Sequence, residues 1–131
     1  MVLRVSAVIG TKDYETTLGA RDHTVLSDES SAGGGQDKGP GPSELMLMGL
    51  GACTSITLRM YAKRKGWDLQ GVESELEMST ENGKSRIERR IKLVGPLEDS
   101  QRSRLLQIAN ACPVHKLLSA GVAIESSLKE A

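Results

Sequence analysis

Hydrophobic and polar positions alternate in three short segments near the start of the chain. Such alternation is typical of strands that bury one face. Gly10 to Asp13 separate the first two segments, and Arg21-Asp22 separate the second from the third, so both interruptions are predicted turns. Strands are therefore predicted over residues 2–9, 14–20 and 23–26.

The composition changes to Ser, Gly, Asp and Pro over residues 27–42, which predicts a surface loop. A loop of this length favours a functional role or mobility. It does not match a phosphate-binding P-loop, because no Gly-Lys-Ser/Thr follows its glycines.

A long apolar stretch over residues 43–65 predicts a helix that ends at Gly66. Ser43, directly after Pro42, is the predicted N-cap. The first four turns have almost no polar side, so we expect this helix to be enclosed on all sides. The stretch is apolar enough to raise the question of a membrane span, but its Thr, Ser and Arg residues favour the core helix of a soluble protein.

The second half of the chain alternates again on both sides of Asn82-Gly83, a strong hairpin signal. A helical repeat of apolar residues follows, and Pro113 interrupts it. The predicted elements are strands over 72–79 and 85–94, helices over 97–111 and 114–118, and a last strand over 122–128. Hairpin strands separated by helices predict an α+β fold, here a single domain over residues 1–131.

The composition excludes some partners. The chain has 17 basic and 17 acidic residues, so its net charge of zero gives no overall attraction to nucleic acid or an anionic membrane. One Trp, two Tyr and no Phe also leave little aromatic surface for stacking bases. The first residues do not resemble a secretory signal, so we expect a reducing, cytoplasmic location without a permanent disulfide.

Cys53 and Cys112 are the two cysteines of the chain. Cys53 lies within the long apolar helix, and Cys112 precedes Pro113 at the start of a short helix, where backbone N–H groups can stabilise a thiolate. Each could be a buried apolar residue, as free cysteines often are. Both lie on the apolar faces of the two main helices, however, and two neighbouring thiols in a reducing compartment favour a redox pair.

A zinc site is the competing interpretation. Cys112 and His115 have a Cys-x-x-His spacing, and Cys53 and His23 would complete four ligands. A second closely spaced ligand pair is missing, so we expect neither a metal nor another cofactor, and we interpret His115 as an ordinary surface residue.

A reactive Cys53 needs a nearby cation, because burial in an apolar helix disfavours the thiolate. Arg21, in its predicted turn, is the candidate, and Glu44 could orient it. Glu44 and Cys53 are nine residues apart on one helix, which places them about 13 Å apart along the axis and about half a turn out of phase. Glu44 is therefore either a helix-start carboxylate or a residue that a partner subunit supplies to the site.

Three sequence motifs resemble those of the OsmC/Ohr family of thiol-dependent hydroperoxide reductases, and within it the OsmC-like redox proteins. The motifs are Gly41-Pro42-Ser43-Glu44-Leu45, Leu50-Gly51-Ala52-Cys53-Thr54 and Cys112-Pro113-Val114-His115. The resemblance implies an intertwined α+β homodimer with two long central helices and active sites at the subunit interface.

The resemblance also implies roles for single residues. Cys53 matches the peroxidatic cysteine, which attacks the organic hydroperoxide, and Cys112 matches the resolving cysteine. A lipoyl or thioredoxin-like dithiol would regenerate the pair, and Arg21 matches the arginine that activates the thiolate. One position departs from the family pattern, because Ser43 stands where the acidic partner of that arginine is usual, and Glu44 comes one residue later. This departure motivates the alternative of a non-catalytic OsmC-like module that binds a small molecule.

Overall fold

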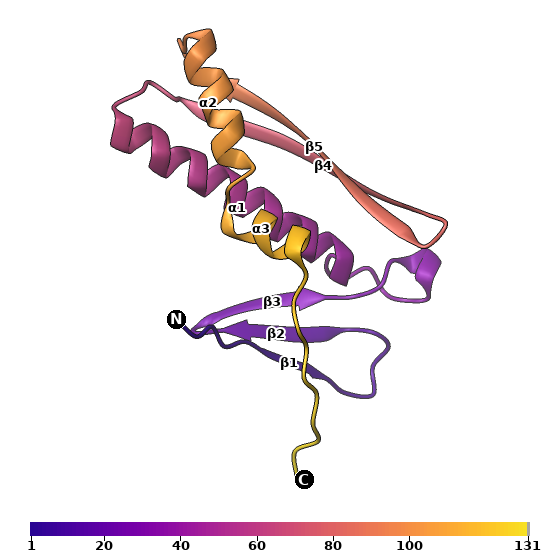
Figure 1. Ribbon diagram of the computed structural model, residues 1–131. Coiled ribbons are helices and arrows are strands. Elements are labelled where there is room, and N and C mark those ends of the chain that lie inside the picture. Colours follow the sequence, from indigo (N-terminus) through magenta and orange to yellow (C-terminus); the bar gives the residue numbers. More distant parts are fainter. Residues whose placement is uncertain (131) are drawn as a thin grey trace. The chain divides into compact units, whose positions relative to one another are not determined.

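The computed structural model describes residues 1–130 (Figure 1). Its helices and antiparallel sheets confirm the α+β class. The contacts divide the chain into two compact units, one ending at Met48 and the other beginning at Gly49.

The first unit contains a three-stranded antiparallel sheet in the order β1-β2-β3 (Figure 1). The strands are β1 (Ser6–Ile9), β2 (Thr16–Ala20) and β3 (His23–Ser27). All three predicted strands are present, although β1 and β2 begin later than the alternation suggested. Ala20 pairs with His23, so Arg21-Asp22 forms a two-residue turn, in which Arg21 has a φ of 55°.

One carboxylate organises the loop between β3 and the first helix. Asp28 is 2% exposed and accepts four backbone N–H groups. The donors are Tyr14 and Glu29 at 3.2 and 2.8 Å to Oδ1, and Gln36 and Lys38 at 3.3 and 3.1 Å to Oδ2. The predicted loop therefore has a defined conformation, and it includes the short helix η1 (Ser31–Gly33).

Close backbone contacts in this loop explain two of its glycines. A side chain at Gly35 would collide with the backbone of Glu29, and one at Gly39 would collide with that of Leu26. The glycine-rich composition thus permits the backbone to fold tightly around the Asp28 carboxylate.

Helix α1 (Pro42–Lys65) has the predicted length, but its N-terminus differs from the prediction. Pro42 is the first helical residue, a position that proline favours because its missing N–H would have no helical partner. Ser43 is therefore not the N-cap. Glu44 Oε1 accepts the N–H of Gly41 at 2.8 Å, which is one half of a capping box. The helix ends before Gly66, whose φ of 72° is the left-handed conformation typical of helix ends.

The middle of α1 is buried on one side only. Leu50, Thr54, Leu58 and Ala62 recur every fourth residue and are buried, whereas Ile56 and Met60 are 55% and 63% exposed. The expectation of a helix enclosed on all sides is therefore not met within the described chain. By length and composition α1 could also cross a membrane, a test that core helices of soluble proteins pass as well.

The second unit contains a long hairpin of β4 (Gly71–Glu81) and β5 (Lys84–Val94). Asn82 and Gly83 connect the strands and have φ values of 53° and 77°. Positive φ at both turn residues matches the twist of a two-residue hairpin, so the turn prediction is confirmed.

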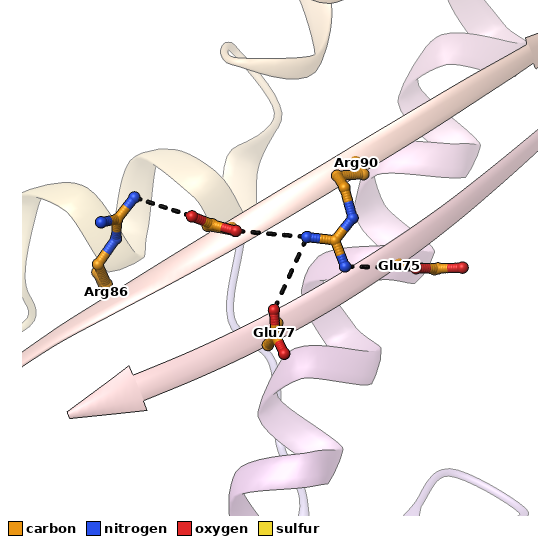
Figure 2. Close-up of polar contacts among 5 residues, drawn as sticks. Glu75, Glu77, Arg86 and Arg90 are labelled. Carbon is orange, nitrogen blue, oxygen red and sulfur yellow. Dashed lines mark hydrogen bonds and ion pairs between the residues drawn. The ribbon is translucent and has the colours of Figure 1, made fainter.

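The two faces of the hairpin differ in chemistry. Val72, Ile91 and Leu93 lie on the inner face and pack against the core, whereas charged side chains cover the outer face. Figure 2 shows Arg90 on that outer face with Glu75 and Glu77. These ion pairs are exposed, and each contributes at most about 1 kcal/mol to stability.

Two further helices complete the second unit, α2 (Asp99–Ala109) and α3 (Pro113–Ala120). Helix α2 is shorter than predicted, because Glu98 begins it with a capping box that includes Gln101. Within residues 1–130 α1 is therefore the one long helix, and the two long central helices expected of a homodimer stay a prediction. The core joins α1 and α2 to the hairpin through buried residues, which are Leu58, Ala62, Leu69, Leu105 and Ala109.

The predicted last strand over residues 122–128 is wrong for the described chain. The C-cap Gly121 ends α3 as predicted, and residues 121–130 then have no regular secondary structure. Val122, Ile124 and Leu128 are 63%, 84% and 100% exposed. An apolar alternation becomes a strand only where a neighbouring strand accepts its hydrogen bonds, and no strand of residues 1–130 pairs with this segment.

The carboxylate of Asp28 is expected to make the stability of the first unit depend on pH. Burial alone would raise the pKa of Asp28, but its four backbone donors outweigh burial and hold the pKa below the ordinary 3.8. A lowered folded-state pKa means that the ionised group stabilises the fold above pH 3.8 and that this contribution is lost as the pH falls through the folded-state pKa.

We therefore expect Asp28→Asn to lower the urea midpoint of unfolding at pH 7. The difference in midpoint between the variant and the wild type should become smaller as the pH falls. Circular dichroism at several pH values measures the midpoints of both proteins. Asp37→Asn, an exposed carboxylate in the same loop, is the matched control and should leave the midpoint unchanged. Equal midpoints for Asp28→Asn and wild type at pH 7 would contradict this role.

Candidate functional site

The sulfur of Cys53 lies at the N-terminus of helix α3. The backbone N–H of Val114, the second residue of α3, donates to Cys53 Sγ at 3.5 Å, and Thr57 Oγ1 is 4.0 Å away. N–H groups at a helix N-terminus favour negative charge, which suits a thiolate. Cys53 is partly exposed.

Cys112 is the N-cap residue of the same helix and is fully buried. Pro113 follows it at the first helical position, so the sequence Cys-Pro itself fixes where α3 begins. The sulfur of Cys53 therefore contacts Val114, which follows Cys112 by two residues. The predicted proximity of the two thiol-bearing segments is confirmed.

Arg89 is a charged residue beside this thiol site that the sequence analysis missed. Its Nη1 donates to Thr54 Oγ1 at 2.9 Å. Its Nη2 lies 3.3 Å from the carbonyl oxygen of Ala109, 3.2 Å from Asn110 Oδ1 and 3.1 Å from His115 Nδ1. One half-buried guanidinium thus contacts α1, the C-terminus of α2 and the first turn of α3.

The partners of Arg89 are oxygen and nitrogen acceptors without a negative charge. Among residues 1–130 the ion pairs formed by arginine in the hairpin involve Arg86 and Arg90, not Arg89. The positive charge of Arg89 is therefore held by dipoles close to Cys53 and Cys112 and is not neutralised by a carboxylate.

His115 is half-buried and is not the ordinary surface residue expected from the sequence. An arginine can only donate, so Nδ1 of His115 is the acceptor in this contact. With a guanidinium against Nδ1, that nitrogen does not face a metal. In the described part of the chain, no three His, Cys, Asp or Glu side chains are grouped as a metal site would require.

The alternation of β5 contains a signal that could have identified Arg89. Ile87, Ile91 and Leu93 occupy inner positions, and Arg89 lies between them in the same phase, opposite Leu76. A charged residue at an inner position needs hydrogen-bond partners in the core. No comparable sequence signal marks His115 beyond its spacing from Cys112.

The two other predicted site residues, Arg21 and Glu44, belong to the first unit. Arg21 is exposed in the turn between β2 and β3, as the sequence suggested. Glu44 is exposed and accepts the N–H of Gly41, which is the helix-start role considered for it. Their participation in catalysis stays a prediction.

Comparison with solved structures shows the fold over most of the chain. An OsmC-like protein from Mycoplasma pneumoniae is 20% identical, with a TM-score of 0.79 over 91% of this chain and 88% of that one. An organic hydroperoxide resistance protein OsmC from Legionella pneumophila is 17% identical, with a TM-score of 0.65 over 90% and 89%. An organic hydroperoxide resistance protein from Elizabethkingia anophelis is 18% identical, with a TM-score of 0.65 over 88% and 86%.

No curated protein matches the chain. A family comparison gives a direct result, because residues 35–127 match the OsmC-like protein family. That range includes both cysteines and Arg89, and it covers well over half of the chain. The family expected from the sequence motifs is confirmed, and the chain belongs to the OsmC-like protein family.

Proposed function

We propose that this protein is a thiol-dependent peroxidase that reduces organic hydroperoxides. The observation that carries the proposal is the position of the Cys53 sulfur at the N-terminus of the helix that Cys112 caps. Membership of the family supports it, because two relatives are named for organic hydroperoxide resistance.

The difference in burial between the two cysteines assigns their roles. Cys53 is partly exposed and can meet a hydroperoxide, whereas Cys112 is fully buried and can react only with a group inside the protein. Cys53 is therefore the peroxidatic thiol and Cys112 the resolving thiol.

The reaction proceeds in balanced steps. The Cys53 thiolate attacks the terminal oxygen of ROOH, the O–O bond breaks, and with one proton the products are Cys53 sulfenic acid and ROH. The Cys112 thiol then displaces water from the sulfenic acid and forms the Cys53–Cys112 disulfide. A lipoyl or thioredoxin-like dithiol reduces this disulfide by exchange and becomes oxidised itself.

A homodimer accounts for the exposed side of α1 and for the role of the first unit. Ala52, Ile56 and Met60 form an exposed apolar stripe at four-residue spacing, and such a surface favours a partner. In this proposal the partner subunit supplies Arg21 and Glu44 to Cys53. Because proteins of this family are soluble, we expect the dimer in the cytoplasm.

Treatment of the reduced protein with cumene hydroperoxide is expected to produce the Cys53–Cys112 disulfide, which peptide mass spectrometry detects. Cys112→Ser should stop at an oxidised Cys53 that dimedone traps. Two free thiols after treatment of the wild type would contradict the proposal.

Steady-state turnover separates a peroxidase from a non-catalytic binding module. With dihydrolipoamide as reductant, the wild type should consume peroxide continuously, and Cys53→Ser should reduce the rate by at least about a thousandfold. Ser79→Ala, on the exposed side of the hairpin, is a control that should keep the wild-type rate. Stoichiometric binding without turnover would instead favour the binding module.

Light scattering at micromolar concentration is expected to give the mass of a dimer. Ile56→Glu places a charge on the exposed stripe of α1 and should shift the mass toward the monomer, because the buried charge would be unpaired. Ser103→Glu, on an exposed position of α2, is the matched control and should leave the dimer intact. A monomeric wild type would exclude a shared active site.

A further inference from the structure

Two arginines that are adjacent in β5 have opposite environments. Arg90 points outward and pairs with carboxylates (Figure 2). Arg89 points inward, between Ile87 and Ile91, where an apolar side chain would be the usual choice. A charge in this position costs stability unless its hydrogen bonds are satisfied, so a function for the guanidinium itself is the natural explanation.

The hydrogen-bond partners of Arg89 flank both thiols along the chain. Thr54 directly follows Cys53. On the other side, Ala109 and Asn110 precede Cys112 by three and two residues, and His115 follows it by three. One planar group therefore connects the segment that carries Cys53 to the segment that carries Cys112.

A rigid connection matters here because disulfide geometry is narrow. The two Cα atoms must come within about 4.4–6.8 Å with a defined torsion at the sulfurs. The planar guanidinium holds several acceptors at fixed angles, which a lysine ammonium on a flexible chain cannot do. Arg89 is thus suited to hold the α2–α3 junction at the distance from α1 that the disulfide needs.

We propose that Arg89 is a positioning residue of the thiol pair, which controls how fast Cys112 captures oxidised Cys53. The inference rests on the proposed peroxidase function. Cys53 sulfenic acid has two fates: attack by Cys112 gives the disulfide and water, whereas a second ROOH gives sulfinic acid and ROH. Faster capture by Cys112 protects Cys53 from this irreversible oxidation.

The test compares Arg89→Met with Arg90→Met. Methionine has a long apolar side chain that suits the inner face, and Arg90 is the matched control because its neighbours are the exposed carboxylates of the outer face. After oxidation by excess cumene hydroperoxide, mass spectrometry gives the ratio of sulfinic acid to disulfide at Cys53. We expect this ratio to rise at least about tenfold in Arg89→Met, partly in Arg89→Lys, and not in Arg90→Met.

Equilibration with glutathione adds a measurement that does not depend on peroxide. A tenfold loss of disulfide stability in Arg89→Met would raise the reduction potential of the pair by about 30 mV. If Arg89 were purely structural, its replacement would lower the melting temperature but would change neither the ratio of sulfinic acid to disulfide nor the reduction potential. Unchanged values of that ratio and that potential in a folded Arg89→Met would overturn the proposal.

A second variant keeps the test decisive if Arg89→Met does not fold. Thr54→Val retains Arg89 and the shape of residue 54 but removes the oxygen that accepts from Nη1. This variant should raise the ratio of sulfinic acid to disulfide and the reduction potential of the thiol pair, each by a smaller factor than Arg89→Met. No change in either would contradict the proposal.

The glutathione measurement also separates this proposal from the proposed function. If Cys53 of the wild type never reacts with peroxide, the peroxidase function fails, and the glutathione measurement still tests the role of Arg89.

Discussion

The guanidinium of Arg89 is the group on which the arrangement of the two cysteine-bearing segments depends. It brings a positive charge onto the packed face of the hairpin, and that charge is acceptable only because polar groups of three helices meet around it. The Thr54 hydroxyl also donates to the carbonyl of Leu50. The end of α2, the start of α3 and the middle of α1 are thus held by one connected set of hydrogen bonds, and the two cysteines lie within it.

Local signals in the sequence were sufficient for much of the fold. Asn82-Gly83 identified the hairpin because both residues accept the positive φ that its turn requires. Gly66 and Gly121 marked the ends of helices for a similar reason. The Cys-Pro sequence at residue 112 indicated the start of α3, and the apolar faces around the cysteines predicted that the two segments meet.

Other features could not be read from local patterns. The alternation over residues 122–128 indicates a face but not the strand that would pair with it. The start of α1 was misjudged because Ser43 has the chemistry of an N-cap, whereas Pro42 takes the first helical position through its fixed φ. The inner position of Arg89 was visible in the alternation of β5, but its hydrogen-bond partners and the role of His115 were not, because these contacts span 20 or more residues.

The short turn of the hairpin has a consequence for the thiol site that lies far from it in the chain. Successive side chains of a strand point to opposite faces, so a shift of β5 by one residue against β4 would reverse every side chain of the strand. Arg90 would then face the helices, and Arg89 would join the solvent-exposed carboxylates. A two-residue connection at Asn82-Gly83 thereby selects which of two neighbouring arginines reaches the cysteines, because one residue fewer between this turn and Arg89 would place Arg90 opposite Leu76.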